Sequence, residues 1–122
     1  MFKSYLKVKQ VNALEWELLE PLVYDAGRFG VITAPAGFVC DFCSVPRVPL
    51  AFWICGDLGH GAGIIHDYIY RVGGMSREDA DRVFYMALRD LGVPPWKAGL
   101  MFKAVRMFAG KIWEAYRRKD NG

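Results

Sequence analysis

The sequence lacks the long apolar run that a membrane-spanning helix requires. The longest candidate, residues 48–55, is far shorter than the roughly 20 residues that such a helix needs. Residues 1–7 also lack the apolar core and the small-residue cleavage site of a secretory signal. We therefore expect no transmembrane segment and a protein that folds in a cytoplasm.

Cysteine is scarce, and its odd count does not suit a disulfide framework. The three cysteines, Cys40, Cys43 and Cys55, are followed by His60. This spacing leaves open a zinc site with three cysteines and one histidine. The ordinary alternative is that the cysteines are small buried residues.

Acidic residues are few in the last quarter of the chain. Residues 94–122 hold seven basic and two acidic groups, whereas the whole chain has a net charge of +3. A basic helix over residues 94–119 would suit nucleic acid, an anionic membrane surface or an acidic protein. The sequence contains no known nucleic-acid-binding module, which disfavours nucleic acid without excluding it. The alternative is a solvated helix face.

Hydrophobic residues are plentiful, at 53% of the 122 residues, and they predict one compact domain over residues 1–122. Residues 1–50 read as strands and turns. Residues 14–18 alternate apolar and charged side chains, and residues 22–24 and 31–33 flank a turn-rich segment. This pattern predicts a small antiparallel β-meander.

Residues 60–118 predict three helices. The first covers about 61–72 and ends at Gly73. The second begins at Ser76, which has Asp79 three residues on, and stops at Gly92. The third starts at Pro94-Pro95 and runs toward residue 118. The fold class is therefore α+β, with the meander packed against three helices.

The first predicted helix places His66, Asp67 and Tyr70 in an otherwise apolar run. Burying such groups costs free energy unless each polar atom finds a partner or a metal. His66 and Tyr70 share a face, since they are four residues apart. Asp81 on the second helix, beside Arg77, is expected to meet them because a short connector joins the two helices.

Further polar groups precede the helices. The loop over residues 35–47 places Asp41, Ser44 and Arg47 at three-residue intervals among aromatic residues. Such groups fix a loop through side-chain-to-backbone hydrogen bonds or project into a site. His60 is a secondary candidate, because it immediately precedes the first helix.

Three sequence blocks together resemble a family of small phage and prophage proteins of unknown function. The blocks are residues 35–47 (PAGFVCDFCSVPR), residues 66–70 (HDYIY) and residues 76–84 (SREDADRVF). The resemblance implies a phage origin but supplies no reaction. The cysteines at positions 40 and 43 depart from the family pattern, so no shared role is expected for them.

One hypothesis is a metal-dependent hydrolase. Asp41, His66, Asp67 and Asp81 offer oxygen ligands and one imidazole, which suit Zn, Mn, Mg or Ca. A bound metal would activate water, with His66 or a carboxylate as the base and Ser44, Arg47, Arg77 and His60 in support.

The His-Asp-x-x-Tyr spacing also resembles the helix of secreted phospholipase A2. That resemblance implies that His66 activates water, Asp67 binds calcium, and Asp81 orients the histidine beside Tyr70. The chain lacks the disulfides of that family, so the resemblance concerns the site and implies no common ancestry.

The competing hypothesis is non-catalytic. The His-Asp-Arg cluster would then be a hydrogen-bond network that specifies the packing. The protein would be a virion or tail component, or an inhibitor that binds a host protein through its basic third helix. It would act in the cytoplasm of the infected bacterium or in the virion. Whether it is an enzyme stays open at this point.

Overall fold

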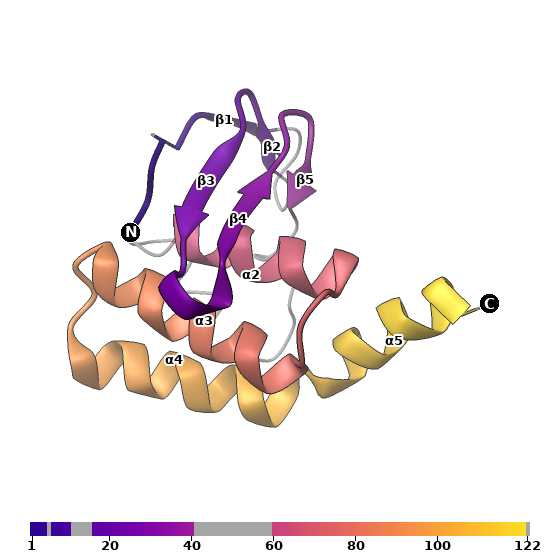
Figure 1. The fold of residues 1–122 in the computed structure, drawn as a ribbon. Helices are drawn as coiled ribbons and strands as arrows, with labels where there is room; N and C mark the ends of the chain where they lie inside the picture. Colours follow the sequence, from indigo (N-terminus) through magenta and orange to yellow (C-terminus); the bar gives the residue numbers. More distant parts are fainter. Residues whose placement is uncertain (5, 11–15, 41–59, 122) are drawn as a thin grey trace.

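The computed structural model describes residues 1–4, 6–10, 16–40 and 60–121. Two small antiparallel sheets lie over helix α2, and helices α3, α4 and α5 follow it (Figure 1). The α+β class is confirmed.

The strands form two sheets. Strands β1 (Val8–Gln10), β2 (Trp16–Leu18) and β5 (Val39–Cys40) make the first sheet, in the order β1-β2-β5. Strands β3 (Leu22–Asp25) and β4 (Val31–Ala34) form a hairpin, which is closed by the short 3-10 helix η1 (Gly27–Phe29). The strands are antiparallel as expected, but β5 pairs with β2 and not with its neighbour in sequence.

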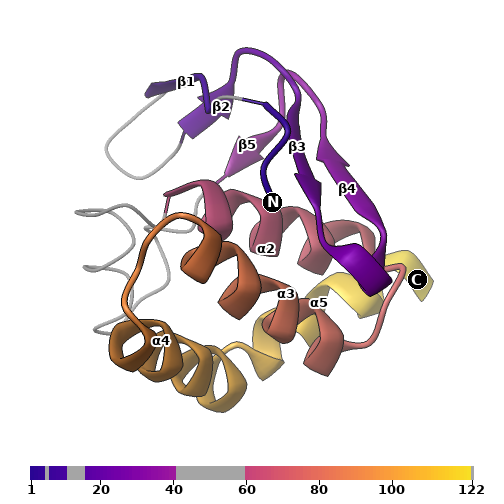
Figure 2. The same ribbon diagram turned by 60° about the vertical axis from the view of Figure 1, so that its left-hand side comes forward.

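The β3–β4 hairpin buries one face, as alternation predicts. Leu22 pairs with Ala34 and Tyr24 with Ile32, and all four side chains are buried. The hairpin lies across α2 (Figures 1 and 2). Its apolar face therefore covers one side of that helix.

Helices α2 and α3 begin and end where the sequence signals them, and α4 begins at its predicted proline. Helix α2 (His60–Val72) is followed by Gly73, whose φ of 74° suits glycine. Helix α3 (Arg77–Asp90) has Ser76 as its N-cap, which accepts a hydrogen bond from the Asp79 amide at 3.1 Å. Helix α4 (Pro95–Phe108) starts with proline, and α5 (Gly110–Asn121) follows it.

Helix α2 is the centre of the core. It contacts α3 and α5 as well as the hairpin, and Ile64, Ile65 and Ile69 are buried. Phe84 and Leu88 of α3 are buried in the same core. Because α2 is covered on several sides, nearly all of its positions had to be apolar, and this is why His66 and Asp67 stood out in the sequence.

The prediction of three helices was wrong in one respect, because the described part of residues 60–118 contains four. The expected third helix divides at Ala109 into α4 and α5, and α5 turns away from α4 (Figure 2). Arg77 caps the end of α4 at this division. Its guanidinium donates to the Val105 and Arg106 carbonyls at 2.9 and 2.6 Å.

No described helix combines the length and the apolar character that a membrane crossing would require.

Candidate functional site

Asp81 is the centre of the site. It lies on the inward face of α3, between Ala80 and Phe84 in the apolar stripe, and its side chain is completely buried. One carboxylate oxygen, Oδ1, lies 2.7 Å from His66 Nε2 and accepts a hydrogen bond from the Tyr70 hydroxyl at 2.6 Å. The expected meeting of α2 and α3 at these residues is therefore present in the structure.

Arginines hold the second carboxylate oxygen of Asp81. Arg106 from α4 donates to Oδ2 at 2.9 Å, and the Arg77 Nε atom lies 3.9 Å from it. Arg77 also donates to the Tyr70 hydroxyl at 3.3 Å. A buried carboxylate with this many donors has its hydrogen-bonding capacity satisfied.

The partners keep Asp81 ionised. Burial acts to raise the pKa of Asp81, but hydrogen bonds from His66, Tyr70 and Arg106 outweigh it and hold the pKa below its ordinary value. Burial and the bond to Asp81 raise the pKa of Tyr70 above its ordinary value. Tyr70 is therefore a protonated donor and Asp81 an anionic acceptor at neutral pH.

His66 is oriented by this carboxylate. An ionised carboxylate can only accept, so the neutral imidazole carries its proton on Nε2 and leaves a lone pair on Nδ1. The ring packs between Tyr70 and Phe84, with ring centroids 4.3 and 4.7 Å away. The His66 side chain is 12% exposed. Within the described residues, no group hydrogen bonds to its Nδ1 atom.

Among the described contacts, Asp67 faces Arg71 and not His66 or Asp81. Its Oδ2 atom lies 3.4 Å from the Arg71 guanidinium, and Arg71 in turn lies over the Phe38 ring at 4.9 Å. Asp67 therefore belongs to a second cluster on another side of α2.

Several sequence candidates lie outside the described residues. These are Asp41, Ser44 and Arg47 of the loop, together with Cys43 and Cys55. His60 is described only by its backbone, at the first position of α2. Among the residues that the structure describes, no three His, Cys, Asp or Glu side chains are grouped to hold a metal. The metal site and the zinc-cysteine site stay predictions.

Sequence reasoning missed Arg106 and Arg117. Arg117 donates to the Tyr70 and Arg71 carbonyls at 2.7 and 2.9 Å, at the end of α2, while its guanidinium lies 4.5 Å from the Trp113 ring centroid. The available signal was that α4 contains basic residues and no acid. A basic residue on the inner side of such a helix can pair only with an acid from another element, as Arg106 does with Asp81.

The fold and the site define a class of protein: a small α+β domain in which a buried aspartate joins a histidine, a tyrosine and two arginines from three helices. Residues 16–105 match the family described as "Protein of unknown function (DUF1353)", and the chain belongs to that family. The matched segment includes His66, Tyr70, Arg77 and Asp81 and ends one residue before Arg106.

One curated relative is the uncharacterized protein y4jT of Sinorhizobium fredii (strain NBRC 101917 / NGR234). It is 37% identical over 84 residues, which are 65% of this chain and 24% of the relative. The chain thus spans about a quarter of the length of the relative that it matches. No solved structure matches.

Proposed function

We propose that the protein is a hydrolase in which His66 and Asp81 form a general-base dyad. One observation carries the proposal. His66 Nε2 lies 2.7 Å from the buried, ionised Asp81, and its Nδ1 atom has no hydrogen-bond partner in the described part of the chain. This is the arrangement of a base that is oriented by a third group.

The step that this dyad supports is the hydrolysis of a carboxylic ester by water. His66 Nδ1 takes a proton from water as the water oxygen bonds to the ester carbonyl carbon. The resulting imidazolium donates through Nε2 to Asp81, which stabilises its charge. The carbon–oxygen bond to the alcohol then breaks, and the alcohol oxygen takes the proton from Nδ1. The products are a carboxylic acid and an alcohol.

Tyr70 and Arg106 position Asp81 in this scheme. Both donate to the carboxylate, so they hold it against the imidazole and keep it ionised. These contacts also match the arrangement that the phospholipase A2 resemblance implies for His66, Tyr70 and Asp81. We treat that likeness as support for ester chemistry at the site and not as common ancestry.

The dyad mechanism requires no metal. The Asp81 oxygens already accept hydrogen bonds from protein donors, and Asp67 lies beside Arg71. The metal-dependent version, with Zn, Mn, Mg or Ca on Asp41, His66, Asp67 and Asp81, would require Asp81 to give up hydrogen bonds from its present donors and Asp67 to turn from Arg71 to the ion. Activity that survives EDTA, with no stoichiometric metal by elemental analysis, would support the metal-free version.

The test is hydrolysis of p-nitrophenyl esters with short, medium and long acyl chains. His66→Gln should lower kcat by about 10²–10⁴-fold, because general-base catalysis contributes that much. Arg118→Ala, an exposed position on α5, is the matched control and should leave kcat unchanged. Circular dichroism must show that each variant is folded. Absence of turnover on the whole ester series, or a folded His66→Gln variant with wild-type kcat, would refute the proposal.

A second candidate function is non-catalytic binding, and it is favoured by an exposed apolar row on α4. Trp96, Leu100 and Met107 are 65%, 46% and 73% exposed and fall on one face at helical spacing. In this version the Asp81 network only fixes the helices. The protein would use α4 to contact a virion protein or a host protein, consistent with the phage origin that the resemblance implies.

A paired comparison separates the two functions. Trp96→Ser with Leu100→Ser should abolish partner binding without loss of stability if α4 is the contact surface. His66→Gln would then leave partner binding intact. The location, in the bacterial cytoplasm or in the virion, is part of the same proposal and is tested by probing purified particles for the protein.

A further inference from the structure

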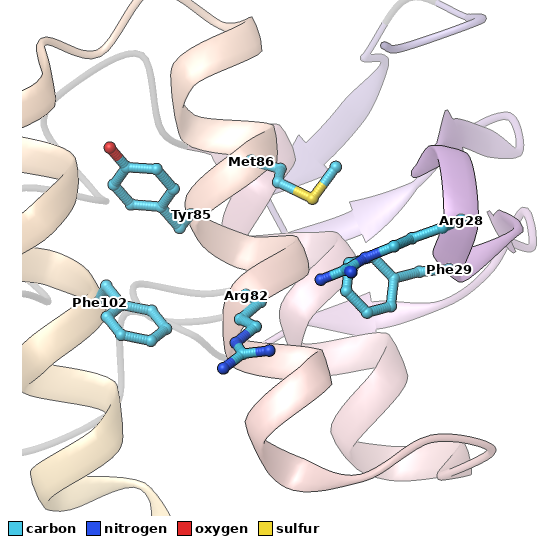
Figure 3. Close-up of a pocket in the computed structure, with 6 residues that line it drawn as sticks. All are labelled: Arg28, Phe29, Arg82, Tyr85, Met86 and Phe102. Carbon is cyan, nitrogen blue, oxygen red and sulfur yellow. The ribbon is translucent and has the colours of Figure 1, made fainter.

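A pocket of about 370 Å³ lies on the outer side of α3, apart from the Asp81 network. It is bounded by η1 on one side and α4 on the other (Figure 3). Six side chains line it: Arg28, Phe29, Arg82, Tyr85, Met86 and Phe102. Its volume falls at the lower end of the range for small-molecule sites.

Two guanidinium groups reach this pocket from different elements. Arg28 comes from η1, where it lies over the Phe29 ring at 4.7 Å. Arg82 comes from α3 and points into the space between Phe102 and Phe29 (Figure 3). Glu78 offsets part of this charge, because it pairs with Arg82 at 2.6 Å. No described acid pairs with Arg28, so the pocket keeps an excess positive charge.

Aromatic rings supply the other walls. Tyr85 and Phe102 pack edge to face, with centroids 6.2 Å apart, and Phe29 lies across the pocket from them (Figure 3). The Met86 thioether adds a polarisable surface to the lining. Flat, apolar walls of this kind favour a planar ring by offset or edge-to-face contact.

We propose that this pocket binds a small aromatic anion. Its ring would lie among Phe29, Tyr85 and Phe102, and its carboxylate, sulfonate or phosphate would lie between Arg28 and Arg82. Arginine suits this role because its planar fork donates two parallel hydrogen bonds to such groups and also stacks on rings. None of the lining residues belongs to the His66–Asp81 network, so the site is independent of the proposed catalysis.

The test uses the fluorescent aromatic anion 8-anilinonaphthalene-1-sulfonate with the folded full chain. Saturable one-to-one binding is expected. Arg28→Ala and Arg82→Ala should each raise Kd by about 10-fold, which corresponds to roughly 1.4 kcal/mol and is close to the lower end of the range for a hydrogen bond to a charged group. Both arginines are exposed, so either variant should fold. Arg118→Ala, an exposed arginine on α5, is the charge-matched control and should leave Kd unchanged.

A neutral probe and two competitors complete the design. N-phenyl-1-naphthylamine has the aromatic body without the sulfonate, so it should bind more weakly and be insensitive to both arginine substitutions. Displacement of the anionic probe by phenyl phosphate or by benzoate identifies which anion the pocket prefers. Equal binding of the two probes, or an Arg28→Ala/Arg82→Ala double variant with wild-type Kd, would overturn the proposal.

Discussion

At the residue scale, Asp81 combines complete burial with a negative charge. Such a group is stable only where donors replace the water that it has lost. His66, Tyr70 and Arg106 supply that replacement from α2 and α4. The same contacts serve either function, because a base needs an oriented partner and a packed core needs a satisfied carboxylate.

Asp81→Asn should lower the free energy of unfolding by about 3 kcal/mol at pH 7, because it leaves Arg106 and His66 without their anionic partner. Urea unfolding measures the loss, and Glu78→Gln at an exposed position is the control. Since the pKa of Asp81 is depressed in the fold, its contribution is present above the unfolded-state pKa of about 4 and is lost as the pH falls below it. If the difference in free energy of unfolding between wild type and Asp81→Asn stayed constant down to pH 2, this account would be contradicted.

Tyr24 gives the opposite dependence on pH. Its buried hydroxyl donates to Asp90 at 2.7 Å, and burial together with this bond raises its pKa. A raised pKa stabilises the fold below the unfolded value of about 10, and the contribution is lost as the pH rises further. Tyr24→Phe should therefore cost about 1–2 kcal/mol at pH 7, and the difference from wild type should shrink above pH 10.

Urea unfolding of Tyr24→Phe and wild type at a series of alkaline pH values checks this prediction. Tyr85→Phe is a suitable control, since Tyr85 is only partly buried and lines the pocket on α3. A Tyr24→Phe variant as stable as wild type at pH 7 would show that the hydrogen bond adds nothing.

At the element scale, arginines end two helices. Arg77 from α3 occupies the last carbonyls of α4, and Arg117 from α5 occupies those of α2. Each guanidinium therefore links two helices as well as closing one. This cross-linking holds α5 against α2 and α4 against α3.

Arg77→Met should lower the free energy of unfolding by about 2 kcal/mol, because methionine keeps the apolar stem but leaves the Val105 and Arg106 carbonyls without that donor. Ser76→Ala, the adjacent N-cap variant, should cost only about 1 kcal/mol. Urea unfolding of both variants gives the comparison. If Arg77→Met lowered the free energy of unfolding by no more than Ser76→Ala does, the proposed stabilisation of α4 against α3 by Arg77 would be disproved.

The start of α3 at Ser76, the ends of α2 and α3 near Gly73 and Gly92, and the start of α4 at Pro95 could be predicted because each of these residues acts on backbone groups within a few positions of itself. The capping of α4 by Arg77 could not, since Arg77 lies about 30 residues earlier in the chain and reaches α4 only in the folded structure. Some residues of the site could likewise be predicted from the sequence and others could not. The His66–Tyr70 spacing and the nearby Asp81 follow from helical periodicity, whereas Arg106 meets Asp81 only through the packing of α4 on α3.

At the scale of the whole molecule, fewer basic groups are available to an anionic partner than the sequence suggests. Residues 94–122 hold seven basic groups, but the Arg106 guanidinium pairs with Asp81 and the Arg117 guanidinium caps α2. What stays on the surface is scattered along α4 and α5, with Lys103, Lys111, Arg118 and Lys119 exposed. Scattered exposed cations of this kind can contact only a few phosphates of a nucleic-acid backbone at once.

We therefore predict weak binding to single-stranded DNA. In fluorescence anisotropy with a labelled oligonucleotide, any binding at low salt should disappear near physiological ionic strength, because few phosphates are contacted. Lys103→Glu with Lys111→Glu should abolish the low-salt signal and change the free energy of unfolding by less than about 0.5 kcal/mol, since both positions are exposed. Arg117→Ala should instead destabilise the fold and have little effect on DNA binding. Tight binding that survives physiological salt would instead make the α4–α5 surface a nucleic-acid interface.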